Sequence, residues 1–398
     1  MSDQDCTPSA AEFSSASRPA PSAGRWRPRW PRSRGRRLVF LALYLGFCWG
    51  VVWLGVRLFW LVGSAVPFSQ RPSAWDHYYP RLRQAGLVAQ PATRTDNRFD
   101  LLLLGGSVLD PEWGTVEAEL QRRLEARLPG RWRLANLGQA GFTSRDSLLQ
   151  YQHLGEQRQR FDLVLVYDGI NDTRLNCCPP ELFRDDYTHA IWYRQFADEL
   201  ARGTPTLSRV AVAGVRSALD RNRLGTPEPE LLEFAAQPQT PRCLRANHAT
   251  LCGLAVERGD PLVLLTFAWH IPPEYTLQKF GDDLLDYARQ GKNRCAAELW
   301  GKAEYVAHAL RLQNDEIRAL AAEWHARQST AAKKPPENRP ETPPVRLLDM
   351  EEQLPHTGEI FIDPCHLTER GSAAFVEILW PVVAESIESF ERAGAARR

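Results

Sequence analysis

Between positions 98 and 392, hydrophobic residues alternate between short continuous runs and longer stretches with helical spacing. The continuous runs, which predict buried strands, are Phe99–Leu104, Trp132–Asn136, Phe161–Tyr167, Pro261–Phe267 and Val345–Asp349. The helically spaced stretches are Val116–Leu128, Arg145–Gln157, Ala246–Arg258, Ala303–Arg327 and Thr368–Arg392. Strands that alternate with helices need crossover connections, so the pattern predicts an α/β fold with a parallel sheet covered on both faces.

A longer apolar run lies near the amino terminus. Residues 38–66 contain a single charged residue, Arg57. Because about 20 apolar residues span a bilayer as a helix, we predict a transmembrane anchor at residues 38–66. Seven arginines lie between positions 25 and 37. By the positive-inside rule, residues 1–37 form a disordered cytoplasmic tail and the rest of the chain lies outside.

Two other interpretations of the apolar run stay open. Gly63-Ser64-Ala65 resembles a signal-peptide cleavage site, and Arg36-Arg37 before the run loosely resembles a twin-arginine export signal. The run is longer and more hydrophobic than an ordinary signal-peptide core, which favours a retained anchor. Every one of these interpretations predicts that the large part of the chain is exported.

The remaining segments differ in composition from the predicted α/β domain. Residues 67–97 mix proline, arginine and aromatic residues, and predict a stalk or a cover over the domain. The domain is interrupted at about 176–242 by proline-rich segments, with helical patterns at Trp192–Ala201 and Ser208–Leu219. Residues 393–398 form a short tail.

Charge is distributed unevenly along the chain. The formal net charge is +1, but residues 1–57 hold nine arginines and three acidic residues. Removing these from the 49 basic and 48 acidic residues of the chain leaves 40 basic and 45 acidic residues beyond position 57. No basic face remains for nucleic acid, so we exclude that class of partner.

Residues that can carry chemistry follow four of the five predicted strands. Ser107 follows the first on a two-glycine turn, Gly141 the second, Asn171 the third, and Asp363 and His366 the fifth. The carboxyl ends of parallel strands share one edge of the sheet, where open α/β sheets place their sites. Acyl transfer needs a nucleophile, a base, a group that orients the base, and oxyanion donors. Ser107, His366 and Asp363 fit the first three roles; the N–H groups of Ser107 and Gly141 and the amide of Asn171 fit the fourth.

In these residues the chain resembles the SGNH hydrolases, also called GDSL-type esterases and lipases. The matching positions are Ser107 in the nucleophile block, Gly141 in the glycine block, Gly169-Ile170-Asn171-Asp172 in the Gly-x-Asn-Asp block, and Asp363-x-x-His366 in the final block. The resemblance covers about residues 98–392 and implies a flavodoxin-like three-layer α/β/α sandwich with five parallel strands. Gly106 stands where the founding motif has Asp, as in many similar bacterial members.

The resemblance implies a serine esterase, and the apolar run predicts that the enzyme is exported. We expect the anchor to pass once through a bacterial cytoplasmic membrane, with the amino terminus inside and the catalytic domain in the periplasm. The expected substrate is an acyl ester, above all an acetyl ester on a cell-envelope or exported polysaccharide. An O-acyltransferase with the same triad, a lysophospholipase or lipase, and an inactive carbohydrate-binding module stay open as alternatives. The oligomeric state is not specified by the sequence.

Aromatic and polar residues near the strand ends are candidate substrate contacts. Trp192, Trp269 and His270 lie near such loops, and aromatic faces stack on sugar rings. The alternative is that these side chains fill or cap the core. The eight cysteines show no C-x-x-C pair, which argues against a structural zinc site. We predict neither a metal nor a cofactor.

One disulfide follows from the implied fold. The resemblance places the loops after the third and fifth strands along one cleft, which brings Cys365 within reach of Cys177 or Cys178. An exported domain would oxidise the pair, and the bridge would hold the loop of His366 against the loop of Asn171. A buried free thiol at Cys365 is the alternative.

Overall fold

The structure is a computed structural model that describes residues 34–87, 92, 97–203, 227–289, 294–332 and 345–396. Most of the predicted cytoplasmic tail, the predicted helix Ser208–Leu219 and the proline-rich stretch before the fifth strand lie outside the described residues. Contacts divide the chain into two units, residues 1–55 and 56–398. Helix α1 (Arg34–Ser64) contains the boundary between them.

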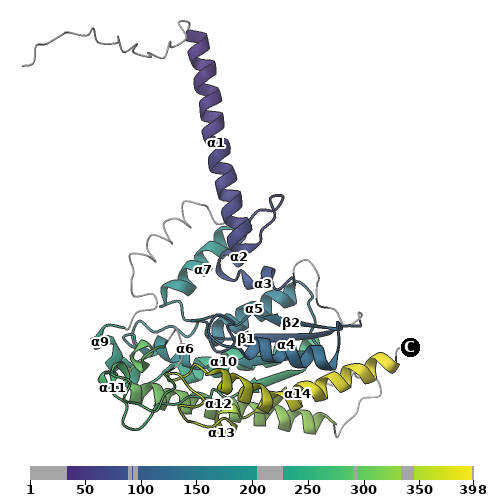
Figure 1. Cartoon of the computed structure of the whole chain (residues 1–398), viewed down its shortest axis with the longest axis vertical. Coiled ribbons are helices and arrows are strands. Elements are labelled where there is room, and N and C mark those ends of the chain that lie inside the picture. The colour runs from purple at the N-terminus through teal and green to yellow at the C-terminus, as the bar shows by residue number, and fades with distance from the viewer. Residues whose placement is uncertain are drawn as a thin grey trace, which may run out of the picture. The chain divides into compact units, whose positions relative to one another are not determined.

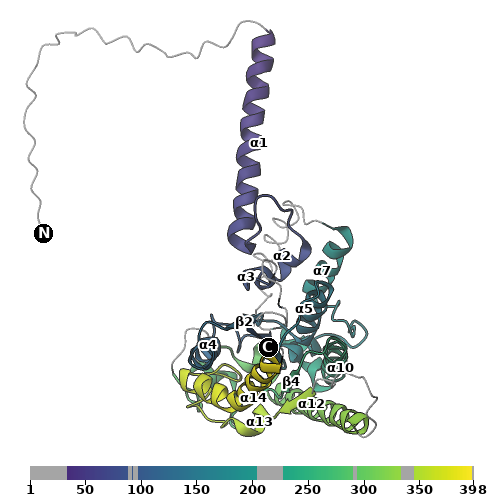
Figure 2. The same cartoon turned by 90° about the vertical axis from the view of Figure 1, so that its right-hand side faces the viewer.

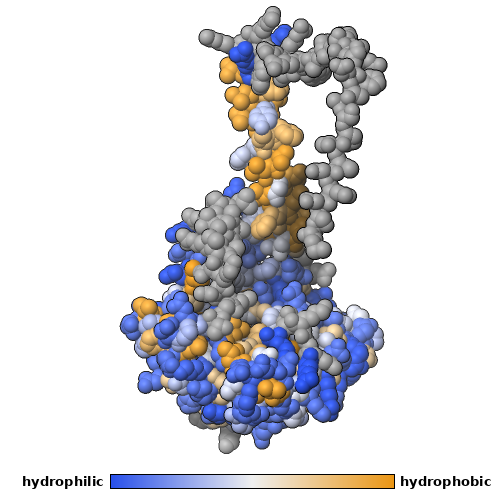
Figure 3. Space-filling model, turned by 60° about the vertical axis from the view of Figure 1, so that its left-hand side comes forward, coloured by the Kyte–Doolittle hydropathy of each residue, from blue (hydrophilic) through white to orange (hydrophobic). Residues whose placement is uncertain are grey.

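Beyond Arg37, helix α1 carries apolar residues on every side, and Arg57 is its one charged residue. Large side chains along it are widely exposed, for example Phe47 at 69% and Trp49 at 72%, and Figure 3 shows apolar residues in orange along its length. It is long and apolar enough to cross a membrane. A helix that is hydrophobic all round needs apolar surroundings. It begins at Arg34, so residues 34–37 are helical and do not belong to a disordered tail.

The second unit is built on one sheet of five parallel strands. They are β1 (Phe99–Gly105), β2 (Trp132–Asn136), β3 (Leu163–Tyr167), β4 (Leu262–Leu265) and β5 (Val345–Leu348), in the spatial order β2-β1-β3-β4-β5. Every residue of β1 and β3 is buried, as expected for a parallel sheet covered on both faces. This is the flavodoxin-like strand order, so the predicted fold class is confirmed.

Helices form a layer on each face of the sheet (Figures 1 and 2). One face carries α4 (Val116–Arg127) and α14 (Glu369–Ala396); the other carries α5 (Ser144–Glu156), α10 (Thr240–Arg258) and most of α12 (Ala303–Ala332). Alternate residues of β1 serve the two layers: Leu101 and Leu103 join the core with α4 and α14, while Leu102 and Leu104 join the core with α5 and α10. Both sides of β1 are therefore apolar from Leu101 to Leu104.

Most predicted boundaries lie within two residues of the observed ones. The larger differences are at α10, which begins at Thr240 instead of Ala246, at α12, which ends at Ala332 instead of Arg327, and at α14, which ends at Ala396 instead of Arg392. In α10 a proline stands in the first turn, where its missing N–H costs no helical hydrogen bond. A proline that suggests a break in the pattern therefore belongs to the helix start.

Residues 67–87 pack against the core that contains α5 and α10 instead of forming an isolated stalk. They contain α2 (Ala74–Tyr78) and α3 (Arg81–Gln84). Tyr79 and Leu87 are 1% and 0% exposed and belong to the same core cluster as α5 and α10. Of the two alternatives for this segment, the burial favours a cover over the domain.

Short elements make up the rest of the described chain. They are α6 (Ile170–Thr173), η1 (Arg174–Asn176), α7 (Ile191–Arg202), α9 (Pro229–Leu232), η3 (Glu233–Ala236), α11 (Leu277–Gly281), η4 (Ala297–Leu299) and α13 (Met350–Gln353). The predicted helix around Trp192 is α7. Several of these elements connect strands β3, β4 and β5 and contribute side chains near the carboxyl edge of the sheet.

Candidate active site

Two glycines let strand β1 end close to β3 and present Ser107. A Cβ at Gly105 would lie 2.4 Å from the carbonyl oxygen of Tyr167, and a Cβ at Gly106 would lie 2.8 Å from Nδ2 of Asn171. Such distances are too short for any side chain, so these positions need glycine. The turn thereby brings the backbone next to Ser107 against the amide of Asn171.

Ser107, His366 and Asp363 form a hydrogen-bonded chain. Oγ of Ser107 lies 2.8 Å from Nε2 of His366, and Nδ1 of His366 lies 2.6 Å from Oδ2 of Asp363. An ionised carboxylate can only accept, so Nδ1 carries the proton and Nε2 is free to accept the hydroxyl proton of Ser107. The three residues are 5%, 2% and 0% exposed. This is the arrangement of a nucleophile, its base and the group that orients the base.

Four N–H groups hold the carboxylate of Asp363. Oδ1 accepts from the backbone N–H of Cys365 (2.9 Å) and of His366 (2.8 Å), and Oδ2 accepts from the backbone N–H of Cys295 (2.8 Å) as well as from the imidazole. Burial by itself would raise the pKa of Asp363, but the charge and hydrogen bond of His366, with these backbone donors, lower it below its usual value. The carboxylate therefore stays ionised beside the imidazole.

The amide of Asn171 is held in one orientation. Its Nδ2 donates to the carbonyl oxygen of Phe142 (2.9 Å), and its Oδ1 accepts from Nε1 of Trp300 (3.0 Å). A carbonyl only accepts and an indole N–H only donates, so both contacts assign the same orientation. One N–H of Nδ2 is used by Phe142, and the second can meet an oxyanion.

Two backbone N–H groups complete the candidate oxyanion site. Within the described part of the chain, the N–H groups of Ser107 and Gly141 have no hydrogen-bond acceptor. Gly141 has a φ of +84°, a left-handed conformation that favours glycine. Gly141 precedes Phe142, whose carbonyl binds Asn171, so the structure brings the predicted donor loops together.

Two tryptophans that the sequence did not single out lie on the imidazole. Trp113 stacks on His366 with ring centroids 4.4 Å apart and an interplanar angle of 27°, and the ring of Trp300 lies 6.3 Å away. Trp113 stands six residues after Ser107, and this closeness is the one sequence signal that could have identified it. Trp300 carries no such signal, because it lies in a long connection after β4.

The predicted substrate-contact residues have other partners. Trp192 donates to Asp146 (3.3 Å), Trp269 donates to Glu351 (3.0 Å), and the His270 ring contacts the carbonyl oxygen of Asp286 (3.0 Å). Trp192 and Trp269 also pack against the two main cores. Within the described residues, the aromatic rings in contact with His366 are those of the two tryptophans above. This arrangement matches the alternative in which Trp192, Trp269 and His270 fill or cap the core.

The predicted disulfide is not formed. All cysteines in the described part of the chain are free, including Cys365, Cys177 and Cys178. Sγ of Cys365 lies 3.6 Å from Nδ1 of His366, while Sγ of Cys177 donates to the carbonyl oxygen of Trp300 (3.5 Å). Burial raises the pKa of Cys365 well above its usual value and that of Cys177 to about 11, which keeps both thiols protonated and unreactive. Trp300, which contacts both loops, makes the connection that we expected from the bridge.

The cover segment holds the loops of Ser107 and Gly141. The carboxylate of Asp110 accepts from the guanidinium of Arg81 (2.6 Å) and from the backbone N–H of Ala140 (2.9 Å). Arg81 also donates to the carbonyl oxygen of Gly138. One arginine outside the α/β domain pattern therefore connects the turn after β1 with the loop after β2.

Three possible metal ligands meet at the triad. Atoms of Cys295, Asp363 and His366 lie within 4.8 Å of one another. The carboxylate of Asp363 already accepts four hydrogen bonds, and burial raises the pKa of Cys295 to about 12. Metal binding there would need a thiolate and the loss of those hydrogen bonds, so the contacts favour the triad over a metal site.

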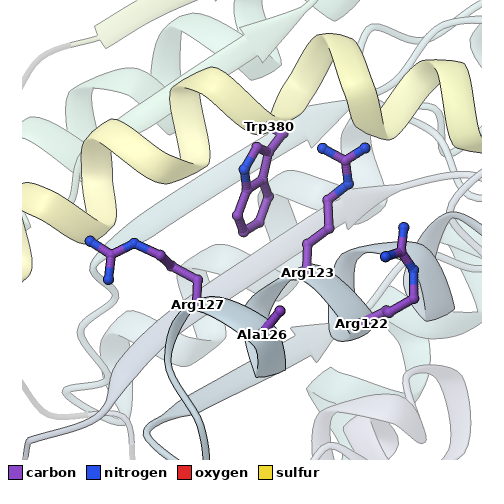
Figure 4. A pocket seen from close by; sticks show the side chains of 5 residues that line it. All are labelled: Arg122, Arg123, Ala126, Arg127 and Trp380. Carbon is purple, nitrogen blue, oxygen red and sulfur yellow. The ribbon is translucent and has the colours of Figure 1, made fainter.

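A separate hollow lies between α4 and α14 (Figure 4). It is lined by Arg122, Arg123, Ala126, Arg127 and Trp380. Arg123 and Arg127 form ion pairs with glutamates of α14. None of the lining residues offers a nucleophile or a carboxylate, and α4 runs back from the edge of Ser107 toward the amino ends of the strands. We therefore do not assign this hollow to the candidate chemistry.

Comparison with known proteins gives weak similarities. No family model and no curated protein matches the chain. Similar solved structures include the acetyl xylan esterase AlAXEase (12% identity, 72% of this chain and 100% of that chain, TM-score 0.37), a lipase/acylhydrolase from Enterococcus faecalis (13%, 74% and 96%, 0.35), and a GDSL-like lipase from Bacteroides thetaiotaomicron (11%, 78% and 97%, 0.38). Identities and scores this low assign neither an activity nor a substrate to this chain.

Proposed function

We propose that this protein is a serine ester hydrolase of the SGNH type. The observation that carries the proposal is the hydrogen-bonded chain from Ser107 through His366 to Asp363, at 2.8 and 2.6 Å. It lies at the carboxyl edge of a parallel sheet, where α/β enzymes place their sites. The orientation of Asn171 and the motif order Ser107, Gly141, Asn171, Asp363 and His366 support the same class.

The geometry fits acylation of Ser107 through a tetrahedral intermediate. Oγ attacks the ester carbonyl while its proton passes to Nε2 of His366, and Asp363 stabilises the imidazolium that forms. The N–H groups of Ser107 and Gly141 and the free N–H of Asn171 receive the oxyanion. Collapse of the tetrahedral intermediate releases the alcohol, which takes the proton from His366. The face of Trp113 favours the positive imidazolium.

Deacylation reverses the proton movements. Water attacks the acyl-serine, His366 accepts its proton, and the acid leaves as Ser107 regains its hydrogen. The triad residues are almost fully buried, which restricts access of water to the acyl-serine. A second candidate is an O-acyltransferase, in which a sugar hydroxyl takes the place of water; the balance between the two reactions depends on how well the occupied site excludes water.

Removal of the nucleophile tests the proposal. Ser107→Ala should lower turnover of small acyl esters such as p-nitrophenyl acetate by about 10³-fold or more. The matched control is Ser389→Ala, whose hydroxyl bonds within helix α14 and which should keep wild-type turnover. Ester turnover by Ser107→Ala close to wild type would refute the assignment. Mass spectrometry of products, with and without an added sugar acceptor, separates hydrolysis from transfer.

We further propose that α1 anchors the enzyme in the cytoplasmic membrane of a bacterium, with the domain in the periplasm and acetylated envelope polysaccharide as substrate. The apolar surface of α1 and the arginines before it support this topology. A reporter enzyme that works only outside the cytoplasm should be active when it is fused after Arg398. The protein should stay with membranes after alkaline washing. Release of a soluble species beginning near Val66 would show a cleaved signal instead.

A further inference from the structure

A short segment of the connection between β4 and α12 contacts both the loop of Asp363 and the oxyanion donor Asn171. This segment, residues 294–300, is far in sequence from every residue of the triad and of the oxyanion site. At one end, Arg294 donates to the carbonyl oxygen of Ile362 (3.1 Å) and the N–H of Cys295 donates to Asp363 (2.8 Å). At the other end, Nε1 of Trp300 donates to Oδ1 of Asn171 (3.0 Å).

Two contacts orient the amide of Asn171: Nδ2 donates to the carbonyl oxygen of Phe142 (2.9 Å), and Oδ1 accepts from the indole N–H of Trp300 (3.0 Å). An asparagine amide can turn about its terminal bond and exchange its oxygen and nitrogen. In the observed orientation Nδ2 lies beside Gly106, the residue before Ser107, because a Cβ built at Gly106 would lie 2.8 Å from Nδ2. The opposite orientation would place a carbonyl oxygen at that point, and an oxygen there would repel a developing oxyanion. The indole N–H opposes this turn because it would then face the N–H groups of the amide.

The position of Trp300 is itself fixed. The residue is 3% exposed, and its carbonyl oxygen accepts from Sγ of Cys177 (3.5 Å). The backbone N–H of Trp300 donates to the carbonyl oxygen of Ala297, which completes the turn at η4. The backbone N–H of Ala297 in turn donates to the hydroxyl of Tyr275 (2.8 Å). These contacts and the burial of Trp300 therefore hold its indole N–H in one place.

We propose that Trp300 is a positioning residue for acyl transfer, whose indole N–H fixes the amide of Asn171 with Nδ2 toward the oxyanion of the acylation step. The inference rests on the proposed function and names a residue that acts through Asn171. It does not require that Trp300 touch substrate. The contacts of Arg294 and Cys295 extend the same role to the segment, because they link the orientation of Asn171 to the position of Asp363.

The test compares Trp300→Phe alone and in an Asn171→Ala background. Phenylalanine keeps an aromatic ring but removes the N–H donor. We expect kcat for p-nitrophenyl acetate to fall 10- to 50-fold in Trp300→Phe with KM changed less than about threefold, a part of the 10²- to 10³-fold that one oxyanion donor supplies. In the Asn171→Ala background the same substitution should lower kcat less than about twofold, because the group it orients is gone.

Two controls separate orientation from general damage. Trp132→Phe removes an indole N–H bond to Glu125 (2.6 Å) at the far end of β2 and should leave kcat unchanged. Thermal unfolding of Trp300→Phe identifies loss of folding. An equal loss of kcat in both backgrounds would show a structural effect and overturn the inference, as would a wild-type kcat in Trp300→Phe.

Labelling of Ser107 by a fluorophosphonate distinguishes this inference from the proposed function. The reagent reports attack by the serine without dependence on the natural ester. No labelling of the wild-type protein would refute the serine hydrolase and the inference with it. Labelling of wild type and of Trp300→Phe at equal rates would overturn the inference alone, and a rate that falls in step with kcat supports it.

Discussion

The two halves of the site are positioned by different means. Ser107, Gly141 and Asn171 stand within five residues of the ends of β1, β2 and β3, so the strands themselves place them. Asp363 lies 15 residues beyond the end of β5, with α13 in between. Its loop is held from outside, by Cys295 and by backbone bonds such as Ala288 N–H to Phe361 O (3.0 Å). The strand ends therefore place the donor half, which Arg81 and Trp300 also contact, whereas the base half depends on distant contacts for its position.

The largest effect should come from the base half. Asp363→Asn should lower kcat by about 10³- to 10⁴-fold, because an amide in this position favours the wrong tautomer of His366. Asp315→Asn, at an exposed helix position, is the matched control and should have wild-type kinetics. A loss below tenfold in Asp363→Asn would mean that backbone contacts alone orient the imidazole.

A smaller effect should come from the donor half. Asn171→Ala should lower kcat about 10²- to 10³-fold with little change in KM, since its free N–H binds the oxyanion and not the ground-state carbonyl. Steady-state kinetics with p-nitrophenyl acetate measures both constants. A variant whose only defect is a higher KM would show that Asn171 binds substrate instead.

The cover segment should contribute less than either half. Arg81→Met removes the bonds to Asp110 and Gly138 and should lower kcat roughly tenfold, because small displacements of catalytic loops reduce the rate. Arg83→Met is the matched control: Arg83 pairs with Asp76 (2.8 Å) within the cover segment. Equal kinetics of the two variants would show that the donor half needs only its own turns.

Acid should act on stability through the base half. The pKa of Asp363 is lowered in the folded protein, so its contribution to stability is present above its unfolded pKa of about 4 and is lost as pH falls through the folded value. Urea unfolding of wild type should therefore lose stability more steeply below pH 4 than unfolding of Asp363→Asn. Parallel curves would show that Asp363 has no such linkage.

Treatment with a reducing agent should have the smallest effect on ester turnover. Because the described cysteines are free, a reducing agent should leave ester turnover within about twofold of the untreated enzyme. Alkylation under denaturing, non-reducing conditions should modify Cys365 and Cys177. A bridge between these two residues in exported protein would restore the covalent connection that we first expected.

The difference between contacts that are close in the chain and contacts that are distant also explains which features the sequence predicts. The strands, the helices and the five motif residues follow from short-range pattern, because a buried strand and the turn after it are adjacent in the chain, whereas the flavodoxin-like arrangement of the strands comes from the family resemblance. Trp300 and Arg81 are different, since they act on the site through long-range hydrogen bonds: Trp300 through one to Asn171, and Arg81 through those to Asp110 and Gly138. None of these contacts leaves a periodic or spaced signal. Trp192, Trp269 and His270 show the converse, because aromatic residues near strand ends also serve packing.

The bond between His366 and Asp363 has a consequence for measurement. Its proton lies between two nearly inaccessible atoms 2.6 Å apart, so exchange with bulk water must wait for an opening motion of the surrounding loops. The exchange rate of that imidazole proton, followed by NMR, therefore reports how often the loops part in the resting enzyme. The measurement needs no ester, so the opening rate of these loops can be determined before the substrate is identified.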